Sequence, residues 1–238
     1  MTSLDPTMTV GAQIAEAVLL HNPKMSREEA YRRVIQLMEL VGIPRPQERY
    51  KLYPYNFSGG MRQRTVMAIA LAVNPQILLA DEPTTALDVT IQAQILDLLR
   101  DIQQSFNTAT ILVSHDLGVV ARAADRVAIM YAGRIVEIGT AEEVYYDPRH
   151  PYTWGLMRSL PALARGKKAL YTIPGMPPSL IDPPKGDAFA CRNEYALAVD
   201  YEEAPPMFRI TDTHYAATWL LDARAPKIES PLKGGRHV

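Results

Sequence analysis

Residues 76–88 read QILLADEPTTALD, and this stretch decides the fold class. Gln76 to Ala80 is a short and mostly apolar run, which is typical of a strand covered on both faces. Two carboxylates, Asp81 and Glu82, follow it. Ligands of open parallel sheets bind beyond the carboxyl ends of the strands. The stretch therefore predicts an α/β sheet with an acidic pair at its ligand-binding edge.

Downstream of this stretch, helix and strand patterns alternate. We expect a helix over Val89–Gln104, a second buried strand over Thr108–Val113, a short helix over Leu117–Ala124, and a hairpin of Val127–Tyr131 with Ile135–Ile138. The expected buried side of the first helix is Ile91, Ile95, Leu98, Leu99 and Ile102. This order implies a parallel βαβ sheet with a small antiparallel edge.

Both ends of the chain differ from this centre. Upstream, the pattern predicts three helices. The first covers Val10–Leu20, the second follows a Ser26/Glu29 capping box, and the third runs from just after Ser58 to about Val73. Downstream, it predicts a helix after a Thr140/Glu143 capping box and another over Pro151–Leu160. Residues 161–184 hold too many prolines for regular elements, and a loop-rich appendage is expected from Asp187 onward.

Composition narrows the class of protein. The 238 residues carry a formal net charge of -1, so no overall basic field favours nucleic acid. The single cysteine, Cys191, excludes an internal disulfide framework and fits a reducing cytosol. No apolar run approaches the roughly 20 residues of a membrane span, and the first residues do not resemble a signal peptide. We expect a cytosolic globular chain that reaches a membrane only through a partner or a surface patch.

Four clusters could carry chemistry, and each has a simpler interpretation. Asp81 and Glu82 could hold Mg²⁺ and orient an attacking water, although an acidic helix start alone explains them. Residues 58–60, Ser-Gly-Gly, could bind an anion at a helix start or only cap that helix. Residues 84–88 could be a simple turn with Asp88 as N-cap. His115 follows the second strand, so parallel pairing places it at the edge that holds Glu82.

In order and spacing, the four clusters resemble the motifs of the ABC ATPase family. Residues 58–64, SGGMRQR, resemble the signature motif, 77–81 Walker B, 85–88 the D-loop, and His115 the switch histidine. The stretches DEPTTALDVT (81–90), SHDLGVV (114–120), HPYT (150–153) and IPGMPP (173–178) look like oligopeptide and dipeptide importers. The resemblance covers essentially the whole chain.

The resemblance implies a role for each motif. Ser58, Gly59 and Gly60, with Met61 and Gln63, would contact ATP held by an opposing subunit. Asp81 would bind Mg²⁺ through water, Glu82 would act on the attacking water, and His115 would touch the γ-phosphate. Asp88 would lie at the dimer interface.

The resemblance also implies a domain plan and a cellular setting. Residues 1–73 would form the helical subdomain, 74–140 part of the RecA-like lobe, and 141–238 the importer-type extension. The partners would be a second and different ATPase subunit, two membrane-spanning permease subunits and, indirectly, an extracellular peptide-binding protein, with no nucleic acid. The chain would lie peripherally on the cytoplasmic face of the cell membrane.

Two departures from the family pattern lead to further expectations. The sequence holds no G-x-x-x-x-G-K-[ST], so we expect it to begin just past the Q-loop, to expose apolar surface on its sheet, and to bind and hydrolyse no ATP alone. Many relatives carry several cysteines in the segment that matches Gly186 to Trp219 and can hold an iron–sulfur cluster there. Only Cys191 is present, so we expect no cluster.

Three functions stay open at this point. The first is an ATPase subunit that drives peptide import. The second is a non-catalytic fragment that at most lends its signature motif to a partner. The third, a soluble ABC protein that acts on ribosomes or DNA, is disfavoured by the importer-type tail and the lack of net basic charge.

Overall fold

The computed structural model describes residues 3–85, 87–160 and 171–232. The chain forms two compact units, Met1–Val119 and Val120–Val238, and the mixed α/β class is confirmed. The division at residues 73 and 140 stays a prediction. No helix in the described ranges combines the length and the apolar character that crossing a membrane requires.

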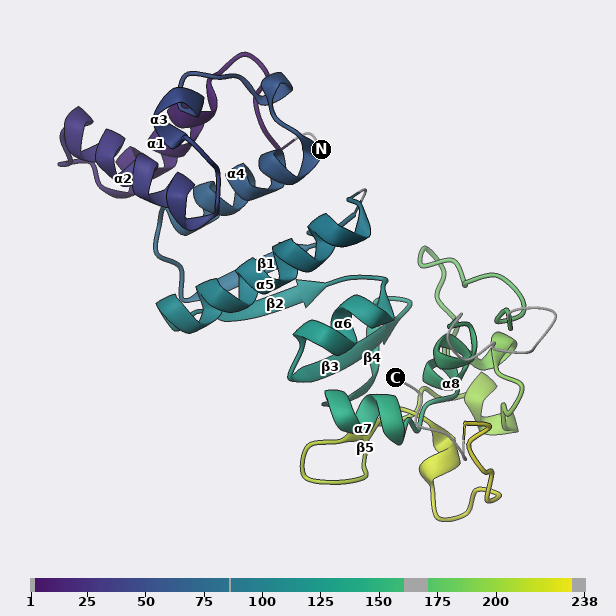
Figure 1. The fold of residues 1–238 in the computed structure, drawn as a ribbon. Helices are drawn as coiled ribbons and strands as arrows, with labels where there is room; N and C mark the ends of the chain where they lie inside the picture. Colours follow the sequence, from purple (N-terminus) through teal and green to yellow (C-terminus); the bar gives the residue numbers. More distant parts are fainter. Residues whose placement is uncertain (1–2, 86, 161–170, 233–238) are drawn as a thin grey trace. The chain divides into compact units, whose positions relative to one another are not determined.

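The first unit begins with a group of helices. Their bounds are α1 (Val10–His21), α2 (Arg27–Leu40), α3 (Pro46–Arg49), the 3-10 turn η1 (Pro54–Asn56) and α4 (Gly59–Leu71). The expected helices are confirmed, and so is the capping box at the start of α2, where Ser26 and Glu29 exchange hydrogen bonds. Figure 1 shows these helices grouped at the N-terminal end of the chain. Buried aliphatic side chains of α1 and α2, such as Ile14 and Leu37, form the core of this group.

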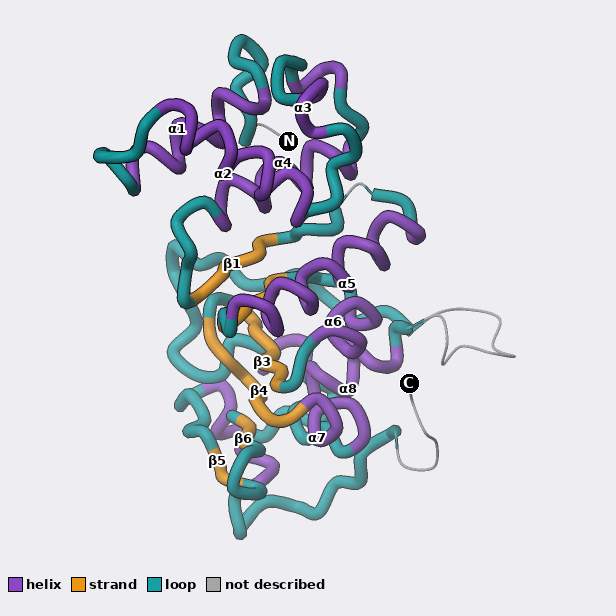
Figure 2. The backbone as a smooth tube through the Cα atoms, turned by 60° about the vertical axis from the view of Figure 1, so that its left-hand side comes forward, coloured by secondary structure: helices purple, strands orange, loops and turns teal. Residues whose placement is uncertain are grey.

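The parallel pair of strands lies in the same unit. β1 (Ile77–Asp81) pairs with β2 (Ala109–Val113) in register, Ile77 opposite Ala109 and Asp81 opposite Val113. α5 (Val89–Phe106) connects the strands and lies along them in both Figure 1 and Figure 2. Its buried residues are Ile95, Leu96, Leu99 and Ile102, whereas the predicted Ile91 and Leu98 are only half-buried. This is the expected strand–helix–strand unit.

The prediction that both strands are covered on both faces is wrong. Leu78 is 7% exposed, whereas its neighbour Leu79 is 65% exposed. Ile111 and Val113 of β2 are also exposed. Successive strand residues point to opposite faces, and α5 covers one of them. The other face carries the exposed apolar surface that the sequence also led us to expect.

The second unit contains an antiparallel sheet in the order β3-β4-β6-β5. The strands are β3 (Arg126–Tyr131), β4 (Arg134–Thr140), β5 (Phe208–Arg209) and β6 (Tyr215–Ala216), and α6 (Leu117–Ala123) precedes them. The predicted hairpin of β3 and β4 is confirmed. The prediction that this hairpin forms an edge of the parallel sheet is wrong. The hairpin belongs to a separate sheet, in which β4 pairs with β6 from the tail.

Short elements complete this unit. They are α7 (Ala141–Tyr146), α8 (Pro151–Arg158) and the 3-10 turns η3 (Ala190–Arg192), η4 (Ala198–Tyr201) and η5 (Trp219–Leu221). The Thr140/Glu143 capping box is confirmed. Residues 161–170 of the proline-rich stretch lie outside the described residues, and residues 171–184 form neither helix nor strand, as predicted. The tail is loop-rich, yet β6 makes it part of the sheet.

Candidate functional site

The carboxyl edge of the parallel strands holds the acidic pair. β1 ends at Asp81, and the backbone N–H of Glu82 continues the ladder by donating to the Val113 carbonyl at 2.9 Å. The chain then turns sharply, because Glu82 adopts a left-handed backbone with φ of 48°. Such a conformation is costly for a residue other than glycine and persists only where the surroundings impose it. Glu82 is therefore held in a fixed, strained position.

The Glu82 carboxylate joins the two strand ends. Oε1 accepts hydrogen bonds from His115 through its backbone N–H at 3.2 Å and contacts its ring Nδ1 at 2.7 Å. Oε2 accepts from the Thr85 hydroxyl. The structure thus brings Glu82 and His115 together as the parallel topology predicts. The contact of Thr85 was not predicted, although a Thr three residues after the acid in a turn is a recognisable signal.

These contacts favour the charged forms of both groups. The Thr85 hydroxyl, followed by His115, lowers the pKa of Glu82, and the Glu82 carboxylate raises the pKa of His115. Hydrogen bonds to a charged form stabilise it. The side chain of His115 is 79% exposed, so this pair faces solvent rather than the protein core. A carboxylate that is ionised and open to water can accept a proton from a water molecule.

Asp81 and the following turn lie beside this pair in sequence. Asp81 is exposed at the end of β1, and an exposed carboxylate is a suitable ligand for a hard cation such as Mg²⁺. In the turn, Thr84 is buried, and its carbonyl accepts from the Gln92 side chain at 3.2 Å. Asp88 caps α5 by accepting from the Ile91 N–H at 3.0 Å. Ala86, within the predicted D-loop, lies outside the described residues.

The Ser-Gly-Gly cluster lies at the start of α4. The Ser58 hydroxyl caps the helix by accepting from the Met61 N–H at 3.4 Å, and the first intrahelical bond runs from Arg62 to the Ser58 carbonyl. The N–H groups of Gly59 and Gly60 precede that bond and have no intrahelical acceptor. Helix starts of this kind attract anions, and phosphate is one of them. Capping and anion binding are therefore compatible here. Gln63 is half-buried on the same helix.

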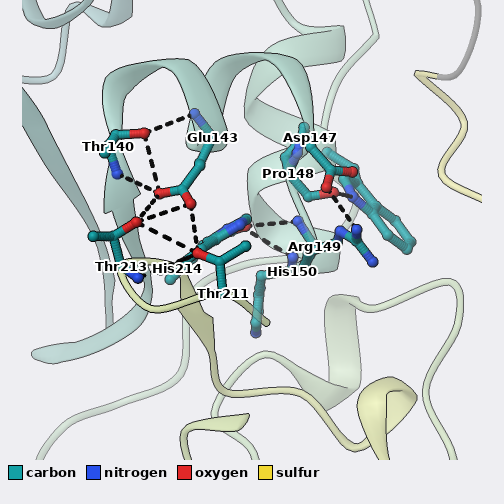
Figure 3. Close-up of polar contacts among 11 residues, drawn as sticks. Thr140, Glu143, Asp147, Pro148, Arg149, His150, Thr211, Thr213 and His214 are labelled. Atoms are coloured by element: carbon teal, nitrogen blue, oxygen red, sulfur yellow. Dashed lines mark hydrogen bonds and ion pairs between the residues drawn. The ribbon is translucent and has the colours of Figure 1, made fainter. Parts of the chain in front are cut away.

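A second polar cluster, in the other unit, was not predicted. Glu137 of β4 and His214 are buried and joined at 2.8 Å, and the same carboxylate accepts from the backbone of Arg149 and His150. Nearby, Glu143 accepts from Thr140, Thr211 and Thr213 (Figure 3). We call Glu137, His214, Glu143, Thr211 and Thr213 the tail anchor. Of these residues, the sequence signalled only Glu143, through its capping box with Thr140.

Two family models match this chain. The ABC transporter model matches residues 1–85, and the model described as oligopeptide/dipeptide transporter, C-terminal region, matches residues 136–198. The dipeptide transport ATP-binding protein DppD of Bacillus subtilis is 52% identical, and the match covers 94% of this chain and 67% of that protein. The chain belongs to the oligopeptide/dipeptide branch of the ABC transporter ATPases.

Other relatives agree with this family. The oligopeptide transport ATP-binding protein OppD of B. subtilis is 60% identical over 97% of this chain, and DppD of Lactococcus lactis is 58% identical over 96%. The chain spans 64% and 65% of their respective lengths. The dimeric structure of MJ0796, a bacterial ABC transporter cassette, is 28% identical with a TM-score of 0.52, covering 58% of this chain and 59% of that one. The ABC ATPase fold is therefore supported by sequence and structure alike.

Proposed function

We propose that this chain belongs to the ATP-hydrolysing subunit of an oligopeptide or dipeptide importer. The observation that carries the proposal is the meeting of Glu82 and His115 at the edge of β1 and β2, in the same unit as the signature helix α4. The names of the relatives support peptide transport and ATP binding.

In this proposal, each motif residue has a distinct task. Glu82, ionised by its contacts with Thr85 and His115, accepts the proton of the water that attacks the γ-phosphate. His115, whose pKa is raised, donates a hydrogen bond toward the phosphate. Asp81 would hold Mg²⁺, and Asp88 lies at the interface with a second ATPase subunit. ATP is the phosphoryl donor, and bound Mg²⁺ would supply positive charge that neutralises its phosphates.

The signature helix acts on the nucleotide of the partner in this proposal. The N–H groups of Gly59 and Gly60 and the Ser58 hydroxyl stabilise negative charge that develops on the γ-phosphate. Met61 and Gln63 also contact the nucleotide. No P-loop sequence occurs in the 238 residues, so the activity belongs to a subunit or assembly that supplies one. The alternative is a chain that lends only its signature motif to a partner, and it rests on the same lack of a P-loop sequence in the 238 residues.

We propose that the assembly contains a different ATPase subunit and two permease subunits, with an extracellular peptide-binding protein delivering peptide. The chain would then act at the cytoplasmic face of the membrane as a peripheral component. Because Cys191 is the single cysteine of the sequence, we predict that the protein holds no iron–sulfur cluster. The visible absorbance of the purified protein tests this prediction.

A Glu82→Gln substitution in the assembled transporter tests the proposal. Because general-base catalysis contributes about 10²–10⁴-fold, we expect ATP turnover to fall by that factor while ATP binding persists. Glu16→Gln, at an exposed position on α1, is the matched control and leaves turnover unchanged. Unchanged turnover in Glu82→Gln would contradict the role of Glu82. No stimulation of a P-loop-bearing partner by the wild-type chain would contradict both functions.

A further inference from the structure

We propose that Ile91 is a positioning residue that holds the signature helix α4 in register with the first turn of α5, and that Gly60 is a glycine because of Ile91. The inference rests on the proposed function, since it concerns how the signature N–H groups are placed. It is carried by four residues, Gly60 and Arg64 on α4 and Ile91 and Gln94 on α5, which we call the α4–α5 seam.

The contact at Gly60 leaves no room for a side chain. A Cβ atom at this position would lie 2.7 Å from Cγ2 of Ile91. That methyl group is attached to a β-branched carbon, and such side chains keep essentially one χ1 rotamer in a helix. Ile91 therefore cannot turn away as the end of a long side chain would. Any larger residue at position 60 must push the start of α4 away from α5.

A second contact fixes the same two helix faces one turn later. Arg64 lies four residues after Gly60, and Gln94 lies three residues after Ile91, so each pair shares one face of its helix. Arg64 donates through Nη2 to the Gln94 side chain at 3.3 Å. Through Nη1 it donates to the Val41 carbonyl at 2.6 Å, at the C-terminal end of α2. Arg64 thus joins α4 to α5 and to α2.

The seam connects the signature helix, which the proposed function places at the nucleotide, to Asp88, which it places at the interface with the second ATPase subunit. The Ile91 N–H donates to the Asp88 carboxylate at 3.0 Å, while the Ile91 side chain contacts Gly60. The backbone from Asp88 to Ile91 and the N–H groups at the start of α4 therefore share one rigid connection. A change at Ile91 displaces the signature N–H groups relative to Asp88, although Ile91 itself contacts no nucleotide group in the proposed mechanism.

Ile91→Ala tests the seam, with Leu98→Ala as the matched control. Both residues are half-buried aliphatic side chains on α5, two turns apart. On the full chain, hydrogen exchange of residues 58–64 is measured for each variant. We expect Ile91→Ala to raise exchange there about tenfold and Leu98→Ala to leave it at the wild-type value. In the assembled transporter, we expect Ile91→Ala to lower kcat about tenfold with KM for ATP unchanged, and Leu98→Ala to change neither.

A double variant separates packing from phosphate contact. If Ile91 requires glycine at position 60, Gly60→Ala lowers the melting temperature in the wild-type background and has little effect in the Ile91→Ala background. An equal drop in both backgrounds overturns the proposal, and so does wild-type exchange at residues 58–64 in Ile91→Ala. Wild-type transporter without ATP turnover would instead refute the proposed function, and the exchange and melting measurements would still decide the seam.

Discussion

The two sheets of this chain differ in which apolar and charged side chains they bury and which they expose. In the first unit, the parallel pair leaves one apolar face exposed and places its charged residues at a solvent-facing edge. In the second, the antiparallel sheet includes strands from the tail and buries a hydrogen-bonded Glu137–His214 pair. The exposed residues of the first unit are therefore available for contacts with other molecules, whereas the buried pair of the second unit holds the chain itself together.

The largest effect should follow from breaking the buried pair. His214→Ala removes the imidazole that hydrogen-bonds the buried Glu137 side chain and leaves a cavity in its place, and the two losses together cost about 3–5 kcal/mol. We expect this loss in urea unfolding of the second unit, followed by tryptophan fluorescence. Both tryptophans, Trp154 and Trp219, lie within Val120–Val238, so the signal reports on that unit.

His21→Ala, at an exposed position on α1, is the control and should leave the tryptophan transition unchanged. A His214→Ala transition within about 0.5 kcal/mol of wild type would mean that the backbone N–H groups of Arg149 and His150 satisfy Glu137 without the imidazole.

A smaller effect should distinguish the two faces of β1. Leu78→Ala removes a buried side chain and should cost about 2–3 kcal/mol, at the lower end for aliphatic truncations in a core. Leu79→Ala, one residue later on the exposed face, should cost less than about 0.5 kcal/mol. Far-UV circular dichroism during urea unfolding measures both. Equal costs would show that the second face is also covered in solution, and the contrast between the sheets would then fail.

Local signals predicted much of this structure. The capping residues Ser26 and Thr140 each formed the hydrogen bonds that their spacing implies. Parallel pairing of two short strands was enough to place His115 beside Glu82. In both cases the deciding interaction lies within a few residues or follows from one strand register.

Other features depend on interactions that no local pattern contains. β6 pairs with β4, and Glu137 meets His214, 77 residues later in the chain. The contact of Thr85 with Glu82 requires the left-handed backbone at Glu82, which is unusual for a glutamate. The covering of β1 on one face only could not be read from its apolar residues, because burial depends on which elements pack there.

The stability of the second unit should depend on pH through His150. His150 is buried, and burial lowers its pKa to about 3 from 6.5, while its Nδ1 caps α8 by accepting from the Tyr152 N–H. As the pH falls below 6.5, the unfolded chain takes up a proton that the folded chain does not bind until about pH 3, so stability falls across this window.

His150→Asn should remove this dependence, because asparagine supplies an N-cap acceptor and does not titrate. Urea midpoints from tryptophan fluorescence at pH 7 and pH 5, compared between variant and wild type, measure it. We expect the wild type to lose more stability than His150→Asn between these pH values. Parallel losses in the two proteins would show that the imidazole is not the group responsible.

The smallest effect should come from the exposed half of the tail anchor. The Thr211 hydroxyl, followed by the Thr140 backbone N–H, lowers the pKa of Glu143 to about 2 from 4.5. A carboxyl group with a depressed folded pKa stabilises the protein above its unfolded pKa and loses that contribution as the pH falls through the folded value. Glu143 should therefore stabilise the second unit fully above about pH 4.5 and progressively less toward about pH 2.

Glu143→Gln tests this, because glutamine has nearly the same size but carries no charge to strengthen the hydrogen bonds from Thr140, Thr211 and Thr213. The gap in urea midpoint between wild type and Glu143→Gln should be constant from pH 7 to 5 and should narrow from pH 4 to 3. Glu142→Gln, at the exposed neighbouring position on α7, should show no such gap. A gap that persists unchanged at pH 3 would mean that Glu143 acts through the shape of its side chain and not through its charge.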